Sequence, residues 1–203
     1  MAAFRVLFVC WGNICRSPTA EAILRRQVGN AGLDGEIEID SAGVSNEHAG
    51  DPPDRRAQAE AVRRGLDLRS LRARQVQPDD WRWFDLLLVT DDSVERRLLR
   101  QAPRRAPREK VRRITDFVST PDPPSEVPDP YYGGADGFRV VYDLLEDACA
   151  GILAHARDQA GLPCPPSSPG LQGAPIGVPS GPSGPAPEAP RAGKPERPDA
   201  STS

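Results

Sequence analysis

The residues with the clearest chemical potential lie in one short segment near the N-terminus, Cys10–Ser17, whose sequence is CWGNICRS. An apolar run precedes it and a helical pattern follows, so its amides and the free N–H groups of the first helical turn are expected to converge and bind an anion. Gly12 and Asn13 are the residue types that best tolerate the positive φ angles of a tight cradle. Cys10 would face these amides, the helix dipole and Arg16, all of which favour a thiolate. The segment therefore predicts a nucleophile and an oxyanion clamp for phosphoryl transfer.

The spacing of Cys10 and Arg16 is weak by itself, because arginine is frequent throughout this chain of 203 residues. The alternative is a buried cysteine at a strand end followed by a surface arginine. Placement between a strand and a helix, with Gly-Asn inside the loop and Ser-Pro after it, leaves the two interpretations balanced.

A nucleophile that attacks a phosphate monoester also needs a proton donor for the leaving oxygen, and Asp129 is the candidate. It lies in Pro128–Tyr132, PDPYY, where the prolines stiffen the backbone. A plain turn is the alternative for such a segment. Tyr131 and Tyr132 could flank an aromatic ring that enters the pocket, which favours the chemical interpretation.

Apolar runs and helical patterns alternate along the first 160 residues. Strands are expected at 4–9, 37–41, 83–90 and 111–116, and helices at 18–28, 54–64, 93–99 and 138–156. This alternation is typical of an α/β fold, a parallel sheet with helices on both faces and ligands at the carboxyl ends of the strands.

Residues 163–203 contain 12 prolines and six glycines but only three bulky apolar residues. Such a segment cannot bury enough apolar surface to offset its ordering entropy. We therefore expect a domain at 1–160 and a disordered Pro-rich tail at 161–203. The Pro-x-x-Pro runs at 179–182 and 187–190 are either a flexible appendage or ligands for a Pro-recognising domain, and a non-catalytic adaptor is the alternative function class.

Composition excludes several function classes. The net charge of −3 argues against a dedicated nucleic-acid binder, although Arg104–Arg113 is basic and is either a solvated loop or an interaction patch. No apolar run approaches the roughly 18 residues of a membrane span. Four cysteines without a paired framework indicate a reducing compartment, and two histidines without ligand spacing predict no metal and no cofactor. We expect a cytoplasmic protein with no membrane or nucleic-acid partner.

Beyond these patterns, the chain resembles the low-molecular-weight protein tyrosine phosphatase family over residues 4–156. The motifs that carry the resemblance are VCWGNICRSP at 9–18, SAG at 41–43, PDRRA at 53–57, ARQ at 73–75, FD at 84–85 followed by Asp91, and DPYYG at 129–133. The resemblance implies a four-stranded parallel sheet and a metal-independent, two-step hydrolysis of phosphotyrosine in protein substrates.

The resemblance also implies residue roles. Cys10 would form a cysteinyl-phosphate, Arg16 would hold the phosphate, and Asp129 would act as general acid and then general base. The phosphate-binding loop would comprise Trp11, Gly12, Asn13, Ile14, Cys15 and Ser17. Ser17 would donate a hydrogen bond to the Cys10 sulfur, and Cys15 would either trap an oxidised Cys10 as a disulfide or serve as a packing residue.

Three positions depart from the family pattern. Trp11 replaces a residue that is usually smaller or aliphatic, which is expected to reshape the pocket mouth. Glu47 stands where many members carry an aromatic on the pocket wall, so its part in substrate binding with Tyr131 and Tyr132 is expected to differ. Leu71 replaces a frequent histidine, so one contact behind the loop is expected to be missing.

Two relatives of the family are alternatives. Arginine-phosphate phosphatases resemble this loop but tend to carry threonine where this chain has Ile14, and they lack a counterpart of Tyr132. Arsenate reductases use the same cradle with two further cysteines in a middle segment, whereas the remaining cysteines here are Cys149 and Cys164. These differences favour phosphotyrosine over phosphoarginine or arsenate as the substrate.

Overall fold

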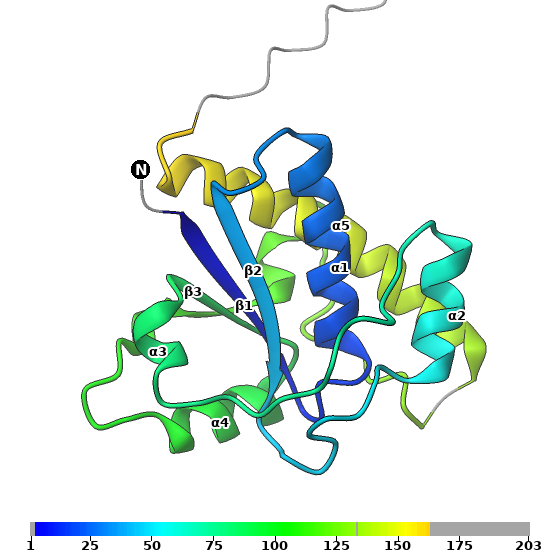
Figure 1. Cartoon of the computed structure of the whole chain (residues 1–203), viewed down its shortest axis with the longest axis horizontal. Coiled ribbons are helices and arrows are strands. Elements are labelled where there is room, and N and C mark those ends of the chain that lie inside the picture. The colour runs from blue at the N-terminus through cyan, green and yellow to red at the C-terminus, as the bar shows by residue number, and fades with distance from the viewer. Residues whose placement is uncertain (1–2, 133, 163–203) are drawn as a thin grey trace, which may run out of the picture. The chain divides into compact units, whose positions relative to one another are not determined.

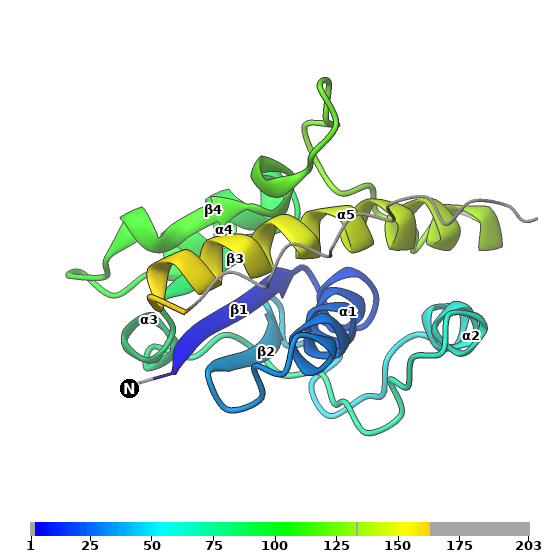
Figure 2. The same ribbon diagram turned by 90° about the horizontal axis from the view of Figure 1, so that it is seen from above.

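Four parallel strands form the centre of the fold, in the order β2-β1-β3-β4 (Figures 1 and 2). The computed structural model describes residues 3–132 and 134–162, so the predicted tail lies outside the described residues. The elements are β1 (Phe4–Cys10), α1 (Arg16–Asn30), β2 (Ile37–Gly43), α2 (Arg55–Arg63), α3 (Asp80–Trp83), β3 (Leu86–Val89), α4 (Asp92–Gln101), η1 (Arg108–Lys110), β4 (Val111–Arg113), η2 (Ile114–Phe117) and α5 (Ala135–Gln159).

The strand β1 is central because both of its faces are apolar. Val6 and Phe8 point into one hydrophobic cluster, and Leu7 and Val9 point into a second one. Successive side chains of a strand alternate between faces, so a continuous apolar run can bury both. This run therefore places Cys10, its last residue, at the carboxyl edge of the sheet.

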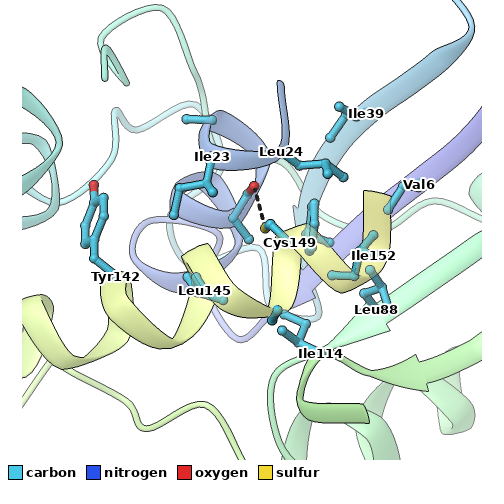
Figure 3. Packing of buried hydrophobic residues seen from close by; sticks show 14 of the residues in the cluster. Val6, Ile23, Leu24, Ile39, Leu88, Ile114, Tyr142, Leu145, Cys149 and Ile152 are labelled. Atoms are coloured by element: carbon cyan, nitrogen blue, oxygen red, sulfur yellow. Dashed lines mark hydrogen bonds between the residues drawn. The ribbon is translucent and has the colours of Figure 1, made fainter. Parts of the chain in front are cut away.

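Helices cover both faces of the sheet. On one face α1 and α5 pack together, and Figure 3 shows Ile23 and Leu24 of α1 near Leu145, Cys149 and Ile152 of α5. A hydrogen bond of 3.6 Å from the Cys149 thiol to a backbone carbonyl of α1, that of Ala20, crosses this contact. On the other face α3 and α4 pack against the side chains of the second cluster. The predicted α/β sheet with helices on both faces is confirmed.

Two predicted strands are shorter than expected. The run at 83–90 forms a strand only over β3, because Trp83 ends the short helix α3 and its exposed indole lies 4.1 Å from the Arg5 guanidinium carbon. The run at 111–116 forms a strand only over β4, because the chain then turns into η2, whose Ile114 is fully buried. A prediction from local apolar content therefore overestimated the length of both strands.

The strand order reverses direction between β1 and β3, so the loops after these two strands diverge and leave a crevice at the carboxyl edge. The loop after β1 begins at Cys10, and the loop after β3 contains Asp91. The sheet therefore places the predicted anion-binding loop where ligands bind in folds of this type.

The described residues do not test the predictions about the domain boundary, the tail and the location of the protein. None of the described helices is long and apolar enough to cross a membrane. The domain boundary at 160, the tail and the cytoplasmic location stay predictions.

Gly151 marks a close contact between α5 and η2. A Cβ at this position would meet the carbonyl oxygen of Phe117 in η2, so replacement by alanine must push α5 away. We expect Gly151→Ala to lower the free energy of unfolding by about 2 kcal/mol, the usual cost of overpacking. Gly137→Ala on the same helix is the control, because its Cβ would meet Pro130 at an ordinary 3.6 Å. Equal stability of both variants in thermal unfolding would contradict this account.

Candidate functional site

The Cys10 side chain is buried at the base of the loop and receives hydrogen bonds there. The amide of Asn13 donates to the Cys10 sulfur at 3.2 Å, and the Ser17 hydroxyl lies 3.0 Å from it. Asn13 has a φ of 57° and is the one non-glycine residue with positive φ in the described chain. That conformation turns the backbone so that its N–H points inward at the sulfur.

The Asn13 side chain ties the loop to its surroundings. Its amide group donates to the Ser17 hydroxyl at 2.9 Å and to the Ser41 hydroxyl at 2.8 Å, and its carbonyl accepts from the Arg74 backbone at 2.9 Å. Both ends of the amide are therefore bonded, and the apolar side chain of Leu71 packs against the core. These bonds offset the strain of the left-handed conformation.

A buried carboxyl group ends this network. The Ser41 hydroxyl donates to Glu21 at 2.6 Å, and Glu21, on α1, is 2% exposed. Burial raises the pKa of Glu21, while the bond from Ser41 and the charge of Arg25 oppose that rise. The network therefore runs from the Cys10 sulfur through Ser17, Asn13 and Ser41 into the body of the protein.

The Arg16 guanidinium is 4% exposed and is held from two sides. One terminal nitrogen donates to Asp91 at 2.7 Å and to the Val127 carbonyl at 3.2 Å. The other donates to Asp129 at 2.9 Å. A guanidinium has five N–H donors, and two of them, on Nε and on the second terminal nitrogen, have no partner in the described chain. Arg16 is thus fixed in place with donors left for a ligand.

Asp91 anchors this arginine through a dense set of hydrogen bonds. Burial works to raise its pKa, but bonds from the Ser93 hydroxyl and the Val94 amide, together with the positive charge of Arg16, outweigh burial and hold the pKa below its ordinary value. Asp91 is therefore a carboxylate whenever the protein is folded near neutral pH.

The loop also depends on a close approach of two backbones. A Cβ at Gly43 would lie 2.7 Å from the Trp11 carbonyl oxygen and 3.1 Å from the Gly12 carbonyl carbon. The backbones of Val44 and Ser45 then donate hydrogen bonds to Cys10 and Trp11 at 3.0 Å each. The end of β2 and the start of the loop therefore support each other.

A pocket of about 200 Å³ opens above the Cys10 sulfur. It is lined by Cys10, Trp11, Gly12, Ile14, Cys15, Arg16, Glu47, His48, Asp129, Tyr131 and Tyr132. Every predicted site residue is in this lining, apart from Asn13 and Ser17, which lie beneath it in contact with the Cys10 sulfur. A larger hollow of about 630 Å³ beside β2 contains none of the predicted residues.

The two tyrosines and Asp129 share one turn at the pocket mouth. The Tyr131 amide donates to the Asp129 carboxylate at 3.0 Å, and the Tyr131 carbonyl accepts from Arg56 at 3.0 Å. The rings of Tyr131 and Tyr132 meet edge to face with centroids 5.1 Å apart. Tyr132 is 92% exposed, so its ring is available to a bound partner.

Cys15 lies in the same lining but in a different environment. Burial raises the pKa of this thiol strongly, and the negative charges of Asp54 and Asp129 add to the effect. Cys15 is therefore a neutral thiol near pH 7, and both it and Cys10 are free cysteines.

Sequence reasoning assigned no role to two residues of the site. Asp91 was noted only as part of a motif, and its position directly after a central strand was the signal that could have identified it. His48 lines the pocket beside Glu47 and contacts Asp51 at 3.1 Å. Nothing in the sequence distinguished His48 from an ordinary loop histidine.

The ion pair of Arg16 and Asp91 yields a pH prediction. Because the folded pKa of Asp91 is lowered, its stabilisation is fully present above the ordinary value of 3.8 and is lost as the pH falls through the folded value. We expect Asp91→Asn to lower the free energy of unfolding by about 3 kcal/mol at pH 7. In denaturant titrations from pH 7 to pH 3 the difference from wild type should shrink. The exposed control Asp122→Asn should show the same small difference in the free energy of unfolding at every pH. A difference for Asp91→Asn that also stays constant with pH would contradict the role of this charge.

Comparisons with known proteins agree with this geometry. The model of the low molecular weight phosphotyrosine protein phosphatase family matches residues 5–160. A low molecular weight protein-tyrosine-phosphatase of Streptomyces coelicolor is 42% identical over 77% of this chain and 95% of its own length. A crystal structure of a protein tyrosine phosphatase from Entamoeba histolytica has a TM-score of 0.73 and 37% identity over 77% of this chain and 99% of that one.

A structure described as a drosophila arginine phosphatase also matches, with a TM-score of 0.68 and 31% identity over 74% of this chain and 96% of that one. The family match spans the whole sheet and both segments that meet at the pocket. The chain therefore belongs to the low molecular weight phosphotyrosine protein phosphatase family.

Proposed function

We propose that this protein hydrolyses phosphotyrosine in protein substrates through a cysteinyl-phosphate formed on Cys10. The observation that carries the proposal is that hydrogen-bond donors, an arginine and a carboxyl group are gathered around the sulfur of one cysteine. Cys10 receives a backbone amide bond and a hydroxyl contact at the base of a pocket whose wall also holds Arg16 and Asp129. A nucleophile, a phosphate clamp and a proton donor are the groups that phosphoryl transfer to a thiol requires.

In the first step the Cys10 sulfur attacks phosphorus, and the P–O bond to the tyrosine oxygen breaks. The Ser17 hydroxyl accepts a bond from Asn13, so its own proton is left for the sulfur at 3.0 Å or for the Ala42 carbonyl at 3.4 Å. The shorter contact favours the sulfur, which stabilises the thiolate before attack and after release. The loop amides and the free donors of Arg16 hold the equatorial oxygens of the phosphate.

Asp129 then supplies a proton to the departing phenolate. Its side chain is 41% exposed at the pocket mouth, on the side from which the tyrosine ring leaves, and Arg16 and the Tyr131 amide orient it. In the second step Asp129 takes a proton from water, the water oxygen bonds to phosphorus, and the P–S bond breaks. Inorganic phosphate leaves, and the thiolate is restored.

The pocket wall supports phosphotyrosine over phosphoarginine. Ile14 lines the pocket and its side chain belongs to the buried apolar core, and the two tyrosines offer ring faces and edges to an aromatic substrate. Trp11, which is 38% exposed, adds a further aromatic residue to the pocket lining. A planar phenyl ring uses these contacts better than a charged, flexible guanidino chain does.

Replacement of the nucleophile tests the proposal directly. We expect Cys10→Ser to lower kcat for p-nitrophenyl phosphate and for a phosphotyrosine peptide by more than about 10⁴-fold, since a serine hydroxyl stays protonated there. Cys15→Ser in the same loop is the matched control and should retain hydrolysis. Full activity of Cys10→Ser, or a phosphoarginine peptide hydrolysed faster than the phosphotyrosine peptide by wild type, would overturn the proposed function.

A leaving-group series tests Asp129. A good leaving group departs without a proton, so Asp129→Asn should lower kcat by roughly 10²-fold or more for phenols of high pKa and far less for activated nitrophenols. Asp122→Asn, an exposed carboxylate in the same proline-rich loop, should show neither effect. A uniform loss across the series would mean that Asp129 is not the proton donor.

A further inference from the structure

Positive charge is concentrated in one segment that the chemistry does not use. Residues 96–113 contain eight arginines and one lysine against a single glutamate, although the chain as a whole has a net charge of −3. This segment covers most of α4, the loop after it, η1 and β4. The charge is therefore unevenly distributed along the chain, and Arg96 is the residue of this segment that lines a cavity adjoining the phosphate pocket.

Four of these arginines have no counter-charge. Arg100 on α4, Arg104 and Arg105 in the following loop, and Arg108 in η1 are all exposed, and none of their side chains makes a hydrogen bond or an ion pair within the described chain. We call these four residues the arginine surface. Many other arginines of the domain are bound to carboxylates instead, among them Arg25, Arg26, Arg63, Arg64, Arg69 and Arg74.

Arg96 connects this segment to the pocket. A second cavity, of about 550 Å³, shares Trp11, Arg16, Asp129 and Tyr132 with the phosphate pocket and is also lined by Arg96. Its lining includes Asp91, Asp92 and Glu126 as well, and Arg96 lies 3.9 Å from Asp92, so the uncompensated positive charge begins beyond this cavity. Arg96 and Arg100 are four residues apart and so lie on the same face of α4.

A neighbouring arginine reinforces this connection. The Arg97 guanidinium carbon lies 5.4 Å from the centre of the Trp11 ring. Arg97 makes no ion pair with any carboxylate in the part of the chain that the structure describes. The indole at the pocket mouth is therefore backed by a cation on the α4 side.

From these observations we infer that the arginine surface is a docking site for an acidic segment of the phosphoprotein substrate, in the same chain as the phosphotyrosine. The inference rests on the proposed function and adds a class of substrate to it. Helix α4 is about 15 Å long, which an extended peptide covers in about five residues. The acidic residues would therefore begin about five positions from the phosphotyrosine.

Charge complementarity is the reason for an acidic partner, and the composition of the surface favours protein over nucleic acid. Residues 94–116 contain no aromatic side chain on which a base could stack. Glu47 lines the phosphate pocket but not the cavity that contains Arg96, and its negative charge would repel a second anionic strand. An acidic segment that begins beyond α4 lies past Glu47 and past the acidic residues of the second cavity, and it faces the arginine surface.

The test uses phosphotyrosine peptides with four glutamates that begin five residues before or five residues after the phosphotyrosine, and the same peptides with glutamines. For wild type at 50 mM salt, kcat/KM should be roughly tenfold higher for the better glutamate peptide than for its glutamine partner. The advantage should largely vanish at 0.5 M salt, because added salt screens exposed charges. Anisotropy with labelled peptides and the Cys10→Ser variant measures the same preference without hydrolysis.

Two double variants locate the effect. Arg104→Gln with Arg105→Gln should lose most of the glutamate advantage and leave p-nitrophenyl phosphate hydrolysis unchanged. Arg63→Gln with Arg72→Gln removes the same charge from exposed positions on and after α2, which Figure 1 shows away from α4, and should keep the advantage.

The possible failures are distinct. Equal rates for glutamate and glutamine peptides in wild type, or equal losses in the two double variants, would overturn the docking site while the proposed function stands. Binding of a single-stranded oligonucleotide that depends on Arg104 and Arg105, with no glutamate advantage, would assign the surface to nucleic acid. If wild type hydrolyses no aryl phosphate, the proposed function fails, and anisotropy alone decides the docking site.

Discussion

The buried ion pair between Arg16 and Asp91 is the interaction on which the site depends. It joins the start of α1 to the loop after β3, across the point where the strand order reverses. A buried guanidinium without a partner would cost several kcal/mol, so the pair must form whenever the sheet forms. Because Asp91 and the Val127 carbonyl hold only one terminal nitrogen, the rest of the fork remains directed to Asp129 and the pocket. The fold thereby fixes a cation in the wall of the pocket that also contains Cys10, before any substrate arrives.

The loop itself is held by a second set of constraints that act on its backbone. Asn13 takes a left-handed conformation, Gly43 permits backbone contact, and the chain of hydrogen bonds through Ser41 ends at the buried Glu21. Each of these would be costly alone, and each is offset by the others. A loop held in this way spends little free energy on reorganisation when a phosphate binds. The residues that are free to adapt to a substrate are therefore the exposed ones at the mouth of the pocket.

Two of those exposed residues, Trp11 and Glu47, are the positions at which the sequence predicts a departure from the family pattern. Both line the pocket, and the Arg97 guanidinium of α4 lies over the Trp11 indole. In the proposed function, the inner part of the pocket transfers the phosphoryl group. The outer part is therefore the place at which this protein can select among phosphoproteins, by charge and by ring contacts.

The sequence by itself determined the α/β class, the alternation of elements and the identity of the loop, because apolar periodicity and the residue types between Cys10 and Ser17 are local properties. It overstated the strands at 83–90 and 111–116, because whether an apolar run extends as a strand depends on the neighbour that it pairs with. It assigned no role to the anchor Asp91, the proximity of His48, or the placement of Arg97 against Trp11. These contacts join residues from separate elements, and only tertiary packing, which brings the ends of β1 and β3 to one edge, decides which distant side chains meet.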